Sequence, residues 1–179
     1  MRLFIAFKTT PFEDELYPIV MKIKEKIGNV KYVGKDNLHL TVKFLGEVKD
    51  EKVKEVNDFL NGSSFLFGKF KFKISGVGGF PLTENARVLF FNVIEGAEKM
   101  REIARFAEKG LSRLGFEEEG KFTPHITFGR AKTFPVNLTL VKVDDFLFEH
   151  EVIGLSLFQS VLTPSGAIYK ELSHFEFVR

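Results

Sequence analysis

The chain has 179 residues, of which 44% are apolar and 28% are charged, and its 26 Lys and Arg exceed its 24 Asp and Glu by a net charge of only +2. This size and composition exclude a disordered chain and are typical of a folded domain with a proper core. The small net charge excludes a global electrostatic field that attracts nucleic acid, so any polyanion must bind locally. Cysteine is absent, which excludes disulfides, thiol nucleophiles and cysteine-type zinc sites.

A strand and a helix are predicted at the start of the chain. Residues 2–8 (RLFIAFK) form a short apolar and aromatic run, which indicates a buried strand. Apolar residues then recur at helical spacing between residues 12 and 27, and Gly28 follows as a terminator. Pro18 is tolerated only in the first turn of a helix, so we expect the regular helix to begin near Tyr17.

A second strand and helix follow, and then a third strand. Residues 37–46 predict a strand that ends at Gly46, and Asp50 is the expected cap of a helix that ends at Gly62. Residues 69–74 (KFKFKI) alternate strictly, which predicts a strand with one wet, basic face.

Glycine and proline divide the middle of the chain. Residues 76–81 predict a loop, and a strand resumes over residues 87–93. A helix is expected over residues 97–114, followed by a strand over residues 121–130. The order of strand, helix and strand therefore occurs twice.

The pattern of the last residues predicts a hairpin. Residues 137–148 are ambiguous between strand and short helix, whereas residues 151–178 are typical of two strands joined by a turn at residues 163–166. We expect an α+β fold of two similar lobes, each an antiparallel sheet flanked by helices, around a central cleft. The lobes exchange strands in this interpretation, so residues 1–179 form a single bilobal domain.

A repeated pattern carries the functional signal. His39-x-Thr41 lies in the strand 37–46, and His125-x-Thr127 lies in the strand 121–130. Side chains alternate along a strand, so each His and Thr share one face. Two such strands would bring two imidazoles and two hydroxyls to a common site. One imidazole can then accept a proton while the other donates one, which suits the in-line displacement of a phosphate diester.

Two cations flank the repeated pattern. Lys43 lies two residues beyond Thr41, hence on the same face of a regular strand, and is expected at the rim of the cleft. A regular strand would turn Arg130 away from His125, but Gly129 permits a bulge that redirects Arg130 toward a phosphate.

The rival interpretations are structural. A single His-x-Thr strand is more often a half-exposed sheet with a satisfied histidine, and only the matched pair favours catalysis. A zinc site lacks a third ligand at suitable spacing, so no metal is expected. His150 and His174 have no partner threonine and are expected to be structural or surface residues.

Other basic and aromatic residues have weaker signals. The face of Lys69, Lys71 and Lys73 is more often solvated than an RNA surface, whereas Lys31 and Lys35, like Lys43, are better placed for a phosphate backbone. Phe44 and Phe80 are candidates for stacking on a base, although core packing is the usual role of phenylalanine.

The pattern resembles the two-histidine (2H) phosphoesterase superfamily, in particular its RNA 2′,3′-cyclic phosphodiesterase branch, also called 2′-5′ RNA ligase. The similarity spans nearly the whole chain. It rests on RLFIAF, NLHLTVKFLGEV, the GVGGFP loop, ARVLF with Arg87, TPHITFGR and LFQSVLTPSGAIY. In one departure, Lys43 stands where relatives often carry Arg, which keeps the charge but loses the bidentate fork.

The resemblance implies a bilobal fold with a central cleft and hydrolysis of a 2′,3′-cyclic phosphate at an RNA end to a 2′-phosphate, without metal or other cofactor. By similarity, His39 protonates the departing 3′ oxygen and His125 activates water, although the reverse assignment is chemically workable. Thr41, Thr127 and Arg130 hold the phosphate. Arg87 joins Phe44 and Phe80 as a candidate RNA contact, and Lys43 joins the phosphate site. Members of this branch also join a cyclic-phosphate end to a 5′-hydroxyl.

Two alternatives remain open: a module that binds nucleotides or RNA without turnover, and a hydrolase of small cyclic nucleotides or ADP-ribose cyclic phosphate. The expected partner is RNA with a 2′,3′-cyclic phosphate terminus, with tRNA fragments among the candidates. The apolar start is too short for a secretory signal, and no run approaches the ~20 apolar residues that cross a bilayer. We therefore expect a cytoplasmic monomer without a membrane partner. Abundant Phe, Lys and Glu fit a thermophilic source.

Overall fold

The computed structural model describes residues 1–179 and contains three α-helices and eight strands. The helices are α1 (Glu13–Lys26), α2 (Asp50–Ser63) and α3 (Ala97–Ser112). The strands are β1 (Arg2–Thr9), β2 (Val30–Tyr32), β3 (Thr41–Glu47), β4 (Phe70–Leu82), β5 (Asn85–Glu95), β6 (His125–Ala131), β7 (Phe148–Thr163) and β8 (Gly166–Glu176).

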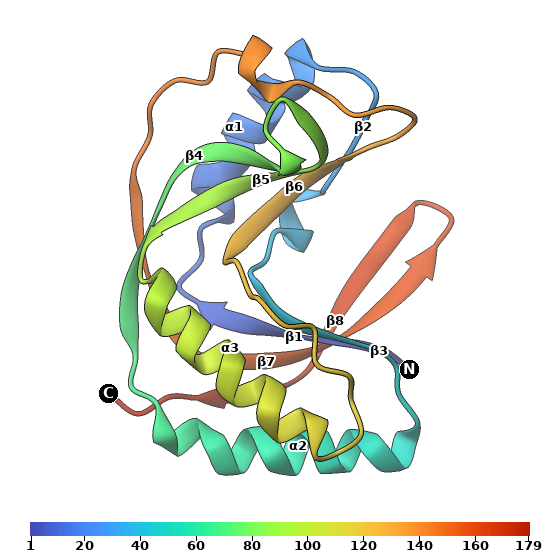
Figure 1. Cartoon of the computed structure of the whole chain (residues 1–179), viewed down its shortest axis with the longest axis vertical. Coiled ribbons are helices and arrows are strands. Elements are labelled where there is room, and N and C mark those ends of the chain that lie inside the picture. The colour runs from blue at the N-terminus through green and yellow to red at the C-terminus, as the bar shows by residue number, and fades with distance from the viewer.

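All eight strands belong to one antiparallel sheet, in the order β2-β6-β5-β4-β7-β1-β3, with β8 paired to β7. Two long strands join its halves: β4 pairs with β7 over residues 70–74 and then turns to β5, while β7 continues beside β1 and β8. Figure 1 shows the two halves as separate sets of strands. The predicted α+β class with an antiparallel sheet and flanking helices is confirmed.

The repeat of strand, helix and strand is present in the topology. In the first copy β1, α1 and β3 follow one another, with the short β2 and a 3₁₀ turn (Lys35–Asn37) before β3, and β1 pairs with β3. In the second copy β5, α3 and β6 follow one another, and β5 pairs with β6. Each helix reaches the half opposite to the strand that precedes it: α1 contacts β2, and α3 contacts β3 as well as β5, which it follows (Figure 1). The chain therefore crosses between the halves immediately before each motif.

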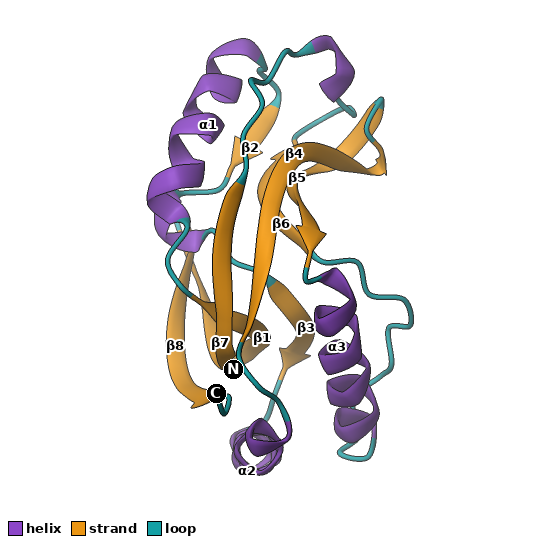
Figure 2. Ribbon diagram, turned by 90° about the vertical axis from the view of Figure 1, so that its left-hand side faces the viewer, coloured by secondary structure: helices purple, strands orange, loops and turns teal.

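One hydrophobic core of 34 buried residues joins the helices to the sheet. Figure 2 shows α1 and α3 on opposite sides of the strands, and α2 at one end. Phe72, Phe91 and Phe128 are fully buried, so much of the unusual phenylalanine content serves packing. None of the helices has both the length and the apolar composition that a membrane crossing requires.

The first helix differs from the prediction. It begins at Glu13 and not near Tyr17, so Pro18 lies inside it. Pro18 has no N–H to bond the carbonyl of Asp14. Three fully buried apolar residues on this helix and three acidic residues in its first turn favour the helix despite that loss.

The predicted loop over residues 76–81 is wrong, because β4 continues through it to Leu82. The glycines let the strand stay extended while it bends: Gly76 has a φ of +78°, and the pairing with β5 shifts on either side of it. A Cβ on Gly79 would lie 2.4 Å from the Cβ of Ala86, so only glycine allows this approach of β4 and β5. Glycine here shapes a strand and does not end it.

Smaller differences concern boundaries. The N-cap of α2 is Lys49, and Asp50 is its first residue; α3 ends at Ser112. The ambiguous segment 137–148 contains a single 3₁₀ turn (Leu138–Leu140) before β7 begins. The hairpin of β7 and β8, with its turn between Thr163 and Gly166, is confirmed.

Candidate active site

His39 and His125 line the same cavity, which has a volume of about 490 Å³. Strands from both halves of the sheet and the β7–β8 hairpin form its wall. The wall residues are Arg2, Leu3, Phe4, Val33, His39, Thr41, Phe44, Gly46, His125, Thr127, Arg130, Ser160, Leu162, Ala167 and Tyr169. The structure thus brings together both His-x-Thr pairs.

The two histidines are held in the same way. His39 lies in the extended residues just before β3, and its Nδ1 donates to the carbonyl of Asn37 at 2.7 Å. His125 is the first residue of β6, and its Nδ1 donates to the carbonyl of Thr123 at 2.8 Å. A carbonyl oxygen only accepts, so Nδ1 carries the proton in both rings. Nε2 is then the nitrogen that takes up or releases a proton in each ring.

Aromatic rings surround both imidazoles. Each has two aromatic neighbours at centroid distances between 4.9 and 5.2 Å: Phe4 and Tyr169 for His39, and Phe80 and Phe90 for His125. Such packing restricts ring rotation and removes water from one side of each ring. The two halves of the site match in their environment as well as in their motifs.

Burial lowers the pKa of both histidines below the ordinary value of 6.5. For His39 the bond to Asn37 opposes this effect, while the charges of His125 and Arg130 add to it. For His125 the bond to Thr123 opposes burial, and Arg130 again lowers the pKa. The free site therefore favours neutral imidazoles, and an anion in the cavity would favour their protonation.

A bulge in β3 moves Lys43 out of the site. Thr41 and Lys43 pair with the consecutive residues Ala6 and Ile5 of β1, which leaves Val42 as an extra residue. Beyond the bulge the alternation of faces is reversed. Lys43 is only 3% exposed and contacts α3, so the prediction that it lies at the cleft rim is wrong; Phe44 lines the cavity instead.

A second bulge in β6 has the opposite consequence for its cation. Thr127 and Gly129 pair with the consecutive residues Phe90 and Leu89 of β5, so Phe128 is the extra residue. Arg130 consequently lines the same cavity as Thr127. The strand bends at the place that Gly129 indicated.

Two other expected contacts lie elsewhere. Phe80 packs edge-on against His125 and does not line the cavity, so its contact is with the ring. Arg87 is exposed outside the cavity wall, with Nη1 3.5 Å from the carbonyl of Thr133. The predictions for direct contact by Phe80 and Arg87 are therefore not supported by their positions.

The remaining histidines have structural surroundings. His150 is buried beside Phe12 and Phe72; its Nδ1 lies 3.1 Å from the hydroxyl of Thr10, and its Nε2 lies 2.6 Å from Glu15. It joins β7 to α1 away from the cavity. His174 is exposed on β8.

The basic strand face and the remaining lysines also lie outside the cavity. Lys69, Lys71 and Lys73 form ion pairs with Glu176, Glu149 and Glu95. Lys35 pairs with Asp14, and neither Lys31 nor Lys35 lines the cavity.

Nine wall residues were missed by the sequence analysis, and three of them carry a charge or an aromatic ring. Arg2 and Phe4 share a face of β1, and Tyr169 reaches the cavity from β8. Alternation places Arg2 and Phe4 on one face, but no sequence signal identifies β1 as the neighbour of β3. Arg2 forms no ion pair and adds a second guanidinium to the wall.

Comparisons with known proteins agree with this geometry. A family model described as LigT like Phosphoesterase matches residues 8–90 and 94–169. An RNA 2′,3′-cyclic phosphodiesterase of Archaeoglobus fulgidus is 37% identical over 179 residues, covering 98% of this chain and 100% of the relative. One from Methanocaldococcus jannaschii is 34% identical, with 98% and 100% covered.

Solved structures are similar over the same length. A Thermus thermophilus protein superposes with a TM-score of 0.83 at 30% identity, covering 99% of this chain and 98% of its own. Escherichia coli LigT in complex with 3′-AMP superposes with a TM-score of 0.79 at 23% identity, also covering 99% and 98%. The latter similarity concerns the fold.

Proposed function

The chain belongs to the LigT-like phosphoesterase family, and from this premise we propose that it is an RNA 2′,3′-cyclic phosphodiesterase, a phosphoric diester hydrolase that converts a 2′,3′-cyclic phosphate end into a 2′-phosphate. One observation carries the proposal beyond family membership. Two histidines from opposite halves of the sheet line one cavity, and in each a backbone carbonyl leaves Nε2 as the reactive nitrogen.

The proposed mechanism assigns one proton transfer to each ring. Nε2 of His125 accepts a proton from water as the water oxygen attacks phosphorus, and protonated His39 donates its proton to the departing 3′ oxygen. The new P–O bond forms as the P–O3′ bond breaks on the opposite side, so the products are a 2′-phosphate and a 3′-hydroxyl. The matched environments of the two rings also permit the reverse assignment.

The polar wall would stabilise the charged phosphate. Thr41 and Thr127 offer hydroxyl donors on the same faces as the two histidines, and Arg130 offers a guanidinium that binds two phosphate oxygens at once. These donors are supplied by the protein itself, so the proposed reaction needs no cofactor. Activity is expected to persist in EDTA.

An exposed aromatic residue supports an RNA end as the substrate. Phe44 is 52% exposed although it lines the cavity, and its ring centroid lies 5.9 Å from that of Phe4. Stacking on a base would cover this surface. E. coli LigT has been solved with 3′-AMP, a ligand that combines a base with a phosphate. We propose the terminal base of an RNA, tRNA fragments among them, as the group that meets Phe44.

The same geometry allows the joining reaction. If a 5′-hydroxyl of RNA replaces the attacking water, the product is a 2′-5′ phosphodiester and the same two proton transfers suffice. We further propose that residues 1–179 act as one domain and as a monomer, because both halves of one chain complete the cavity. A cytoplasmic location without a membrane partner belongs to the same proposal.

The decisive experiment uses an oligoribonucleotide ending in a 2′,3′-cyclic phosphate, incubated with the protein and EDTA. We expect a product with a terminal 2′-phosphate, and its loss in His39→Ala and in His125→Ala. Binding without turnover would instead identify a nucleotide-binding module. Faster turnover of a cyclic mononucleotide or ADP-ribose cyclic phosphate than of the oligomer would identify a small-molecule hydrolase.

A further inference from the structure

A buried ion pair lies behind the cavity wall. Lys43, which the bulge turns away from the cavity, contacts the carboxylate of Glu108 on α3. The Lys43 side chain is 3% exposed and that of Glu108 is 14% exposed. Charges removed from water to this degree are costly unless they are paired and hydrogen-bonded. Neither residue lines the cavity, so substrate binding does not explain why the charges lie here.

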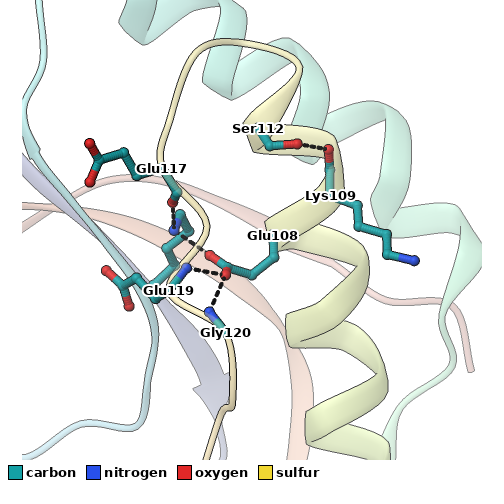
Figure 3. A network of polar contacts seen from close by, with 7 residues as sticks. Glu108, Lys109, Ser112, Glu117, Glu119 and Gly120 are labelled. Atoms are coloured by element: carbon teal, nitrogen blue, oxygen red, sulfur yellow. Dashed lines mark hydrogen bonds and ion pairs between the residues drawn. The ribbon is translucent and has the colours of Figure 1, made fainter.

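The pair holds one short segment of chain. Nζ of Lys43 also donates to the carbonyl of Glu117 at 2.6 Å. The second oxygen of Glu108 accepts from the N–H of Glu119 at 2.6 Å and from that of Gly120 at 3.2 Å (Figure 3). Between residues 117 and 122 the segment makes no other hydrogen bond. Its side-chain anchor is Phe122, whose ring lies 6.4 Å from that of Phe7.

The segment has a defined place in the fold. It carries the chain from α3, beside one half of the sheet, to β6 in the other half (Figure 1). Gly120 precedes His125 by five residues, and Lys43 follows Thr41 by two. The ion pair therefore connects the strand of the first motif to the approach of the second motif.

The charge state of Glu108 suits this task. Burial alone would raise the pKa of Glu108, but the hydrogen bonds from Lys43 and from the N–H groups of Glu119 and Gly120 lower it overall. The carboxylate therefore stays ionised, as an acceptor for all three donors, across the neutral range.

We propose that Lys43 and Glu108 are positioning residues, which fix the segment 117–120 against β3 and thereby hold His125 in place relative to the first motif. The proposal deepens the proposed function, on which it rests, because it assigns the alignment of the two histidines to a contact outside the cavity. A displacement of about 1 Å between reacting groups can reduce a rate about 100-fold.

The test removes both charges together. Lys43→Met/Glu108→Leu leaves no unpaired buried charge, and such replacements are often neutral or stabilising, but it deletes all three bonds to the segment. We expect a melting temperature close to that of the wild type, kcat lower by about 10- to 100-fold and KM changed by less than about threefold. The Lys73→Met/Glu95→Leu variant removes a more exposed Lys–Glu ion pair between β4 and β5, outside the cavity, and should retain the wild-type kcat.

A second readout does not require activity. Burial lowers the pKa of His125, so a released segment should admit water and move this pKa up toward 6.5, as followed by NMR titration of the imidazole. A folded double variant with unchanged His125 titration and unchanged kcat would overturn the proposal. A wild-type protein without phosphodiesterase activity would refute the proposed function, while the titration would still decide this inference.

A milder variant covers the case in which the leucine variant does not fold. Lys43→Met/Glu108→Gln retains one side-chain oxygen for the N–H of Glu119 but removes both charges. It should show the same changes in kcat and in the His125 titration, at smaller size. Wild-type values for both measurements in this variant would contradict a positioning role.

Discussion

Phe44 and Arg130 occupy equivalent positions in the two motif strands: each lies three residues beyond its threonine, past a bulge, and each lines the cavity. The repeat thus presents two like histidines and two like threonines, but one aromatic ring and one guanidinium. The two histidines and two threonines suit a reaction in which one imidazole accepts a proton and the other donates one. Phe44 and Arg130 make the two sides of the cavity different, so we expect an anion near Arg130 and a base near Phe44.

Phe44→Ala should therefore weaken substrate binding more than it slows the reaction. Stacking of one base on an aromatic side chain contributes ~1–3 kcal/mol, so KM for the cyclic-phosphate oligomer should rise about 5- to 140-fold while kcat stays near the wild-type value. Phe44→Tyr should restore KM. Steady-state kinetics distinguish the two parameters, and a loss confined to kcat would show that Phe44 does not bind the base.

Arg130→Lys tests the role of the guanidinium. Lysine retains the positive charge but cannot form two parallel hydrogen bonds to phosphate oxygens. Because these bonds are expected to strengthen in the transition state, kcat should fall by about 10- to 1,000-fold. The Arg87→Lys variant, whose side chain lies outside the cavity, is the control and should match the wild type. Equal activity of the two variants would remove Arg130 from the mechanism.

The pH dependence of activity follows from the lowered pKa values of both histidines. In kcat/KM, which reports the free enzyme, both limbs of the bell-shaped profile should lie below pH 6.5. A bound phosphate favours imidazolium, so the profile of kcat should be displaced to higher pH. Initial rates across pH at low and at saturating substrate give the two profiles. Coincident profiles would argue against an anion beside these rings.

The same shifts affect stability. A histidine whose folded pKa lies below 6.5 takes up its proton more readily in the unfolded chain. Each histidine therefore lowers the free energy of unfolding as the pH falls through 6.5 toward the folded pKa, and has no such effect above this window. The His39→Ala/His125→Ala variant should lose less stability than the wild type between neutral and mildly acidic pH, as measured by urea denaturation.

The sequence predicted the helices and the paired motifs because both depend on local patterns: helical spacing of apolar residues, and the two-residue period of a strand. A bulge breaks that period. Gly129 indicated the bulge in β6, but the bulge in β3 occurs at Val42 and Lys43, which carry no such signal, so Lys43 lies on the face opposite to the predicted one. The place of Arg2 in the cavity wall was not predictable either, because it depends on which strand lies next to β1.

Arg2 offers a test of substrate length. Its guanidinium lines the cavity at the start of β1 without an ion pair, and a phosphate farther along an RNA strand is the partner expected for it. Arg2→Ala should raise KM for an oligomer by about 10- to 140-fold, in line with the loss of a hydrogen bond to a charged group worth ~1.5–3 kcal/mol, but leave KM for a cyclic mononucleotide unaffected. Equal effects on both substrates would place Arg2 at the terminal nucleotide.

A last prediction concerns Gly79 of β4 and the support of the His125 ring. A Cβ at Gly79 would lie 2.4 Å from the Cβ of Ala86 and 3.3 Å from two backbone oxygens, none of which can move without shifting β4 or β5. Gly79→Ala should lower the free energy of unfolding by ~1–3 kcal/mol. It should also reduce kcat, because the adjacent Phe80 packs on His125.

Gly62→Ala is the matched control for this substitution. Gly62 lies in α2, and a methyl group at this position would have no atom within 4 Å, so alanine there should raise stability by ~0.5–1 kcal/mol through its higher helix propensity. Chemical denaturation measures both effects. Gly79 precedes Phe80, which packs on His125, so a Gly79→Ala protein with wild-type stability and wild-type kcat would show that the close approach of β4 and β5 is not what supports this ring.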